Sequence, residues 1–156
     1  KMGKVITLIW LAFTIILTVL WIINAIEYGR IDSWLNRAKD AGNPNQVSEF
    51  LTNYKQALSD KHLIEGKYYS VFKYPGKYMP VYIRAVNGLI ERGEALVIQT
   101  PTDTSYQMGL INLEKDLGDL ESVAFSVWLA NGGIIIVVLC VISWFTFYIP
   151  LIIEIG

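Results

Sequence analysis

The sequence predicts an all-α membrane protein in which two transmembrane helices flank a small extracytoplasmic four-helix bundle-like domain. Both ends of the 156-residue chain are apolar. Of its 13 basic and 14 acidic residues, all but Lys1, Lys4 and Glu154 lie between Glu27 and Glu121. Within this polar middle, apolar residues recur at steps of three and four, the spacing of one helix face. Apolar ends around a polar middle are typical of a two-pass membrane protein.

Residues 5–26 form the first predicted transmembrane helix. This run carries no charged residue, and a helix of its length crosses a hydrocarbon core of ~30 Å. The alternative is a cleaved signal peptide, whose apolar region spans about 7–15 residues and ends at a small-residue cleavage site. The run is longer than that and leads into Ala25-Ile26-Glu27, a poor cleavage site. We therefore expect an uncleaved anchor.

Residues 123–153 form the second predicted transmembrane helix with its interfacial lead-in, and 133–153 are its membrane core. Trp128 precedes this core and Trp144 lies toward its far end. Aromatic side chains of this kind are enriched at the two interfaces of a bilayer. Their positions favour a span across the full membrane.

Basic residues beside the first span predict the orientation. Lys1 and Lys4 precede it, which favours a cytoplasmic N-terminus, and two spans then return the C-terminus to the same side. The domain at 27–122 would lie outside the cell. The sequence contains no Asn-x-Ser/Thr site, which is in keeping with the plasma membrane of a prokaryote.

Four helices are predicted between the spans. The first continues from the first span and stops at Gly42, and Asn45 is expected to cap the second helix. The apolar face of the first helix is Ile31, Trp34, Leu35 and Ala38. The face of the second is Val47, Phe50, Leu51, Tyr54 and Leu58.

The other two helices follow a long connection at 63–79. The third is expected to begin at Pro80, and its face is Tyr82, Val86, Leu89, Gly93 and Leu96. Thr104 and Gln107 have the spacing of a capping box for the fourth. The fourth face is Tyr106, Leu110, Leu113, Leu117 and Leu120, and we expect this helix to continue into the second span. Residues 68–72 could instead form a short strand.

Composition argues against most kinds of chemistry. A net charge of −1 gives no basic footprint for nucleic acid. The chain has one histidine, His62, and one cysteine, Cys140 within the second span, so one chain cannot assemble a zinc or copper site from these ligands. No nucleotide-binding or hydrolase motif occurs. We expect a protein that is not an enzyme and that uses no cofactor or metal.

The segment 66–84 is the main candidate for a binding surface, because it is basic, rich in tyrosine and free of acidic residues. Tyrosine and arginine often anchor protein interfaces. The candidates are Lys67, Tyr69, Lys73, Tyr74, Lys77, Tyr78 and Arg84. The partner would be a neighbouring subunit, a glycan or an anionic group. The alternative is that these rings cover one end of the helical domain, which connectivity places far from the membrane or down its side.

Small polar residues mark one face of each span. These faces are Thr7, Thr14 and Thr18 in the first span, and Cys140, Ser143 and Thr146 in the second. Small residues let membrane helices approach closely, which favours helix packing. A polar pathway is the alternative, but neither span carries an acid, base or amide at mid-depth.

Together these patterns favour a non-catalytic integral membrane subunit that scaffolds or stabilises a larger complex. Its partners would be other membrane subunits or copies of itself, together with the lipid bilayer. The alternative is an extracytoplasmic ligand-sensing module, because the layout resembles that of bacterial chemoreceptors and sensor kinases in topology. A receptor of that kind would need an output domain beyond Gly156. A channel is disfavoured, since neither span has a polar pore face.

Overall fold

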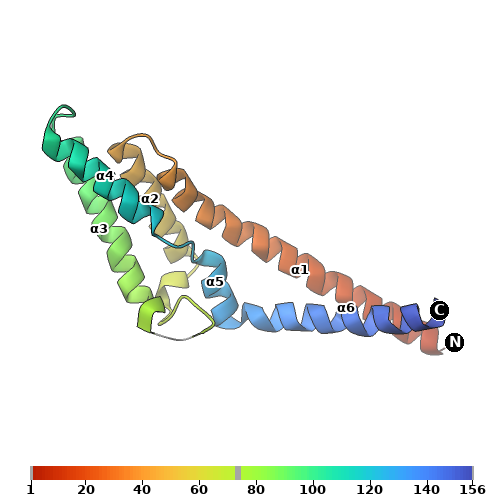
Figure 1. Cartoon of the computed structure of the whole chain (residues 1–156). Helices are drawn as coiled ribbons and strands as arrows, with labels where there is room; N and C mark the ends of the chain where they lie inside the picture. The colour runs from red at the N-terminus through yellow and green to blue at the C-terminus, as the bar shows by residue number, and fades with distance from the viewer. Residues whose placement is uncertain (1, 73–74, 156) are drawn as a thin grey trace.

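The structure, a computed structural model, describes residues 2–72 and 75–155, with side chains from 7 to 72 and from 76 to 146. All regular elements within these residues are helices (Figure 1). Two helices are long and apolar enough to cross a membrane, at Thr7–Lys39 and Ala124–Thr146. The prediction of an all-α chain with two apolar helices of membrane length is therefore confirmed.

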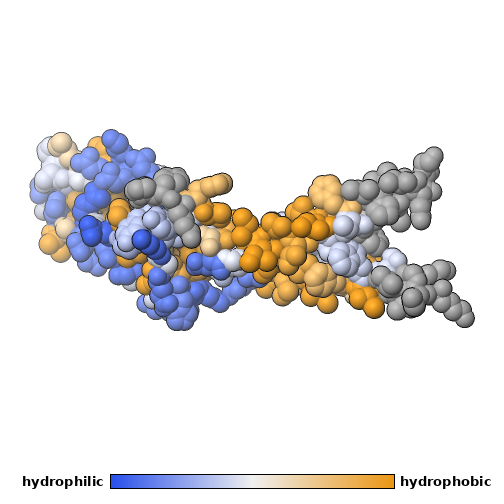
Figure 2. All heavy atoms as spheres, turned by 90° about the horizontal axis from the view of Figure 1, so that it is seen from below, coloured by the Kyte–Doolittle hydropathy of each residue, from blue (hydrophilic) through white to orange (hydrophobic). Residues whose placement is uncertain are grey.

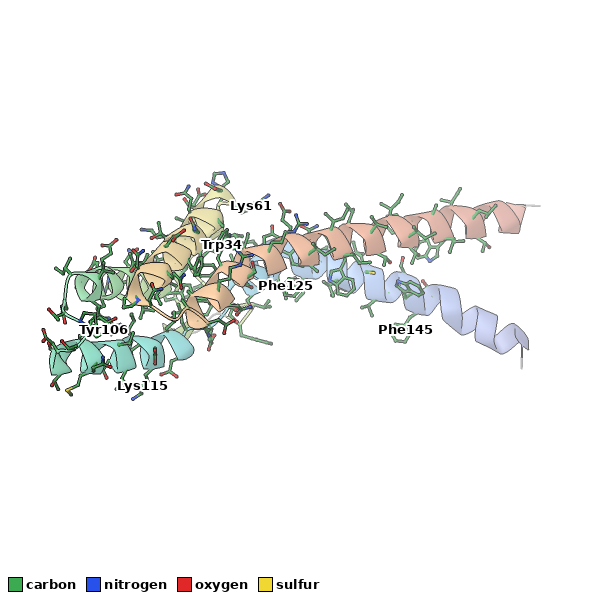
Figure 3. All side chains as sticks on the ribbon, turned by 90° about the horizontal axis from the view of Figure 1, so that it is seen from above. Trp34, Lys61, Tyr106, Lys115, Phe125 and Phe145 are labelled. Carbon is green, nitrogen blue, oxygen red and sulfur yellow. The ribbon has the colours of Figure 1, made fainter. Side chains whose placement is uncertain are left out.

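The molecule consists of a narrow apolar stem and a wider polar head. In the stem, α1 (Met2–Lys39) and α6 (Ile134–Ile155) pack side by side, and we define it as residues 7–26 and 134–146. We call residues 27–133 the head. Figure 2 shows apolar surface gathered on the stem and mostly polar surface over the head. Outward-facing stem side chains include Phe145, which points away from α1 (Figure 3) and is 62% exposed.

The head contains the second part of α1 together with α2 (Pro44–Asp60), α3 (Met79–Val97) and α4 (Thr104–Gly118). α2 packs against both α1 and α3, and α4 packs mainly against α3. The apolar faces predicted for the first three of these helices are largely buried. Their fully or nearly fully buried members are Leu35, Ala38, Val47, Leu51, Tyr54, Leu58, Tyr82, Val86, Leu89 and Leu96. Each such Leu or Val contributes about 1.5–3 kcal/mol relative to an exposed side chain.

The start of α2 corrects one prediction. Asn43, and not Asn45, is the N-cap, because its side chain accepts a hydrogen bond of 2.9 Å from the Gln46 backbone N–H. Pro44 then occupies the first helical position, where its missing N–H costs nothing. α3 likewise begins one residue earlier than predicted, at Met79.

Gly93 sets the close approach of α2 and α3. A Cβ atom at this position would lie 2.2 Å from the Ser48 Oγ and 3.1 Å from the Pro44 carbonyl oxygen. The Ser48 hydroxyl donates to the Pro44 carbonyl at 3.0 Å and to the Ile90 carbonyl of α3 at 3.3 Å. Glycine in the predicted apolar face therefore brings the two helices together, with a serine hydroxyl between their backbones.

The predicted fourth helix is wrong at both ends. Asp103 precedes α4 and makes no capping bond, so Thr104 is the first helical residue and no capping box forms. The Gln107 side chain donates instead to the Pro101 carbonyl at 2.7 Å. At the other end α4 stops at Gly118, and the chain does not continue as a helix into the second span.

A break separates α4 from the stem. After the link at residues 119–123, α5 (Ala124–Trp128) and a π-helical turn (Leu129–Gly133) lead into α6. Within that turn Gly132 has φ +113°, a conformation that only glycine adopts without strain. Figure 1 shows α5 standing at a steep angle to α6 on either side of this point.

The connection between α2 and α3 contains two short 3₁₀ turns, at Leu63–Glu65 and Pro75–Lys77. The possible strand at 68–72 is reduced to an isolated antiparallel bridge between Tyr68 and Tyr78. The connection lies beside the foot of α5, close to where α6 begins (Figure 1). Of the two predicted locations, far from the membrane or down the side of the domain, the first is wrong, because α2 ends on the stem side of the head.

Candidate functional site

A buried hydroxyl network, formed by Asp32 of α1, Tyr54 of α2 and Tyr82 of α3, joins these helices to the start of α5. The Asp32 Oδ1 atom accepts a hydrogen bond of 3.2 Å from the Ala124 backbone N–H and one of 3.3 Å from the Tyr54 hydroxyl. The hydroxyl oxygens of Tyr54 and Tyr82 lie 3.1 Å apart. Asp32 thus satisfies an amide at the start of α5 that has no partner within that helix.

The same network reaches the backbone of the 119–123 link. The Tyr82 hydroxyl donates to the Glu121 carbonyl at 2.6 Å, and the Val123 N–H donates to the Tyr54 hydroxyl oxygen at 3.4 Å. Side chains of α2 and α3 therefore hold the middle of the link and its end at α5.

Lys39, in the last turn of α1, holds the other end of the link. Its ammonium donates to the Gly118 carbonyl at 3.2 Å and to the Leu120 carbonyl at 2.6 Å. The last carbonyls of a helix lack intrahelical partners and carry partial negative charge, so a lysine is well suited to them. Asp32 and Lys39 are two turns apart on α1, and together they bind both sides of the break between α4 and α5.

Burial controls the protonation of the two tyrosines. Tyr54 is fully buried and Tyr82 is 5% exposed. Burial raises the pKa of Tyr54 and the pKa of Tyr82 above the usual range, because a buried phenolate would lose its hydration. Both hydroxyls therefore stay protonated even at a pH where an exposed tyrosine begins to ionise, and they act as hydrogen-bond donors. Their arrangement fixes the junction of the head and the stem.

The structure divides the predicted binding residues of 66–84 into two groups. Tyr69 is 9% exposed, with its ring centroid 5.2 Å from that of Tyr82. The Lys77 ammonium forms an ion pair with Glu121 and lies 5.3 Å from the centre of the Tyr69 ring. Tyr78 is half-buried, with its ring edge-on to Tyr68. These three side chains cover the stem-side end of the head.

The other candidates face outward or fall outside the described side chains. Lys67 and Arg84 are exposed, and the Lys67 ammonium lies 5.7 Å from the centre of the Tyr68 ring. Phe72, which is not among the predicted binding residues, is 78% exposed. Lys73 and Tyr74 lie outside the described residues.

The small polar residues of the stem meet along the α1–α6 contact. Thr14 and Ser143 are buried, and the Thr18 hydroxyl lies 3.5 Å from the Cys140 Sγ. The Trp144 indole N–H donates to the Thr18 hydroxyl at 3.1 Å. Near the other end, the Trp10 indole N–H donates to the Thr146 hydroxyl at 3.2 Å. Thr7 is exposed.

Four large apolar side chains are exposed where α3 ends and along the first half of α4, and we call them the tip patch. Val97 and Ile98, where α3 ends, are 50% and 87% exposed. Met108 and Ile111, one turn apart on α4, are 61% and 62% exposed. The turn between α3 and α4 lies at the end of the head remote from the stem (Figure 1).

Among the described residues, no group of three or more His, Cys, Asp or Glu side chains is placed to hold a metal ion. None of the protein-family models, curated proteins or solved structures compared with the chain matches it.

Sequence reasoning missed Asp32, Lys39 and the hydroxyls of Tyr54 and Tyr82 as a connected group. One signal was present: tyrosines within two apolar helix faces each need a hydrogen-bond partner for the buried hydroxyl. Asp32 follows Ile31 in the first apolar face and was the nearest acid to that face. The link backbone that completes the network could not be identified from periodicity, since the fourth helix was predicted to run through it.

Proposed function

We propose that this chain is a non-catalytic integral membrane subunit that scaffolds or stabilises a larger membrane complex. α1 and α6 cross the bilayer in this proposal, and the head projects from it to bind other subunits or a second copy. The observation that carries the proposal is the tip patch, because it contains four of the six large apolar side chains that are exposed on the described part of the head.

Water-facing apolar groups of this kind mark association sites when they gather on one surface. The tip patch lies at the opposite end of the head from the stem, so the bilayer around the stem does not cover it (Figure 1). α4 presents much of its surface outward, since Leu113 and Leu117 are its only buried side chains among the described residues. A partner that covered Met108 and Ile111 would bury apolar surface that the chain itself leaves in water.

The stem supports the same function in a different way. Thr and Trp side chains along the α1–α6 contact pair with one another or with backbone carbonyls, as Thr14 does with the Trp10 carbonyl at 3.0 Å. The outer faces carry large apolar side chains, among them Leu20, Ile23, Leu139 and Ile142. These faces suit lipid chains or the helices of other subunits.

The size of the assembly in mild detergent tests the proposal. The wild-type chain should migrate well above the mass of its 17.7 kDa polypeptide plus detergent. The double variant Ile98→Ser, Ile111→Ser should weaken assembly by about 2 kcal/mol or more if these side chains are interface hot spots. Val81→Ser is the matched control, because Val81 is 56% exposed at the other end of α3.

A monodisperse monomer in several mild detergents would count against the proposal. Equal weakening by the double variant and by the Val81 control would also count against it, because the tip patch would then have no special role. Circular dichroism of each variant shows whether the head remains folded.

The proposed orientation places the head outside the cell and both termini inside. With Cys140 replaced by Ser, the variant Ile98→Cys presents one exposed thiol at the tip of the head. An impermeant maleimide should label this thiol in intact cells. Labelling only after the membrane is opened would reverse the orientation.

A ligand-sensing module remains the second candidate, and one observation favours it. α1 runs without a break from the stem into the head, and its residues Asp32 and Lys39 hold the link that leads to α6. Movement in the head could therefore reach both stem helices. If the chain is a sensing module, a small-molecule ligand should raise the melting temperature of the head. If it is a scaffold, that temperature should rise only when its protein partners bind.

A further inference from the structure

The boundary between the stem and the head can be located by matching α1 to α6. Trp10 pairs with Thr146, Thr18 contacts Cys140, and the Tyr28 ring stacks on Trp128 with centroids 5.7 Å apart. From one pair to the next, the residue number rises along α1 and falls along the second segment, as expected for two antiparallel helices. The apolar run of α1 ends at residue 26. The residues that lie opposite this point are those of the turn that precedes α6 (Leu129–Gly133).

Aromatic rings gather at this level. Phe125 lies next to Trp128 with ring centroids 5.3 Å apart, so that Tyr28, Trp128 and Phe125 form one cluster (Phe125 is labelled in Figure 3). Aromatic side chains concentrate where a bilayer meets water. The cluster therefore lies where the surface of the bilayer would meet the molecule.

The segment 66–72 lies against the same level. Lys67, Tyr68 and Ser70 line a shallow recess together with Ala130 and Asn131, the residues just before α6. A Cβ atom on Gly66 would be 3.9 Å from the Asn131 side-chain nitrogen. Figure 1 shows this segment at the foot of α5, close to where α6 begins.

The chemistry of this segment matches a lipid headgroup layer. Phe72 is a large apolar ring that is 78% exposed, and Lys67 is an exposed cation. The sequence contains no acidic residue from 66 to 90. Basic residues near a membrane surface are attracted to anionic lipids, and aromatic rings enter the boundary between headgroups and acyl chains.

We propose that residues 66–72 rest on the bilayer surface as a lateral anchor. Phe72 enters the headgroup–acyl boundary, and Lys67 binds the phosphate groups of anionic phospholipids. This surface is separate from the tip patch, which lies at the other end of the head. The proposal rests on insertion of the stem in a bilayer, and the experiment below includes a position that tests that insertion separately.

Fluorescence quenching of the full chain in vesicles tests the anchor. In a Cys140→Ser background, an environment-sensitive dye is attached to Phe72→Cys, Leu139→Cys or Ile98→Cys. The vesicles contain equal parts of phosphatidylcholine and phosphatidylglycerol, with bromine on the acyl chains near the headgroup. Iodide is the quencher in water. Leu139 is a stem position 42% exposed, and Ile98 is the matched head position at the tip.

The dye at 72 should be quenched by brominated lipid and shielded from iodide, as at 139, whereas the dye at 98 should respond to iodide alone. The dye at 72 should also respond more strongly to brominated phosphatidylglycerol than to brominated phosphatidylcholine. Lys67→Gln should lower that preference about fivefold, the equivalent of ~1 kcal/mol for one basic residue at an anionic surface.

Iodide quenching at 72 equal to that at 98 would overturn the anchor. Shielding at 72 from both quenchers would also overturn it, because a protein surface would then cover the segment. If the dye at 139 is not quenched by lipid, the stem does not lie in the bilayer, and both this proposal and the membrane-subunit proposal fail. If lipid quenching is absent at 72 but present at 139, only the lateral anchor is overturned.

Discussion

The two sides of the stem enter the head in different ways. On one side α1 continues as a single helix from Met2 to Lys39. On the other side the chain leaves α4 through a link without helical structure, forms the short α5, and turns through Gly132 before α6 begins. One connection between stem and head is thus the continuous helix α1, which we call the rod. The other is interrupted between residues 119 and 133, and we call that segment the joint.

The difference shows how the joint is stabilised. Asp32 binds the start of α5, and Lys39 binds the end of α4, so the continuous helix supplies the polar groups that hold the interrupted one. Tyr54 and Tyr82 add contacts from α2 and α3. The rod therefore positions the joint, and changes to either should have separable effects.

The largest effect is expected from breaking the rod. Gly29 lies within α1 at the start of the head, and a Cβ atom there would meet nothing within 4 Å. Gly29→Pro should destabilise the chain by about 3 kcal/mol or more, because proline removes a helical hydrogen bond and clashes with the preceding turn. Denaturant titration of the full chain in mild detergent, followed by circular dichroism, measures this loss.

The next largest effect is expected at Asp32, whose carboxylate joins the rod to the start of α5. Asp32→Leu leaves the Ala124 N–H without its acceptor and should cost about 2–3 kcal/mol, since a buried unpaired donor is expensive. Asp32→Asn keeps an Oδ1 acceptor, so its cost should stay below about 1 kcal/mol. The same titration compares the two variants. Equal costs would show that the carboxylate charge, and not the hydrogen bonds, holds the junction.

A smaller effect should come from the joint itself. Gly132 has φ +113°, so Gly132→Ala should cost about 1–2 kcal/mol through backbone strain, even though a Cβ there meets nothing within 4 Å. A neutral result would mean that the chain can pass into α6 without this conformation.

The smallest effect is a gain at the matched glycine of the rod. Gly29→Ala should stabilise the chain by about 0.5–1 kcal/mol, because alanine loses less backbone entropy in a helix and fits the open space around this position. The opposite signs expected at residues 29 and 132 express the contrast between the two connections. A loss of stability at 29 would place a partner or lipid contact on that face of α1.

Helical periodicity predicted much of this fold because burial repeats along one face of each helix. The faces of α2 and α3 are buried as the spacing indicated, from Val47 to Leu58 and from Tyr82 to Leu96. Periodicity failed where the chain stops being helical but keeps its spacing. Leu113, Leu117 and Leu120 follow the 3-4 pattern, yet the helix ends at Gly118, and Leu120 is buried from a non-helical position.

The candidate site was harder to predict than the fold. Composition drew attention to 66–84, but it could not show that Tyr69 and Lys77 turn inward while Phe72 and Lys67 face outward. That division depends on the Tyr68–Tyr78 bridge, which folds the segment back on itself. The tip patch was also missed, because Met108 and Ile111 interrupt a polar helix face without forming a periodic run.

The length of α1 beyond the apolar run also has a consequence for any partner. Residues 27–39 remain helical, which at about 1.5 Å per residue carries the chain ~20 Å past the level of residue 26. This helix sets how far the end of α1 lies from the stem. In the proposed membrane subunit, the tip patch lies beyond the end of α1, so a protein that docks there must present a surface past this level, out of reach of membrane neighbours with short loops.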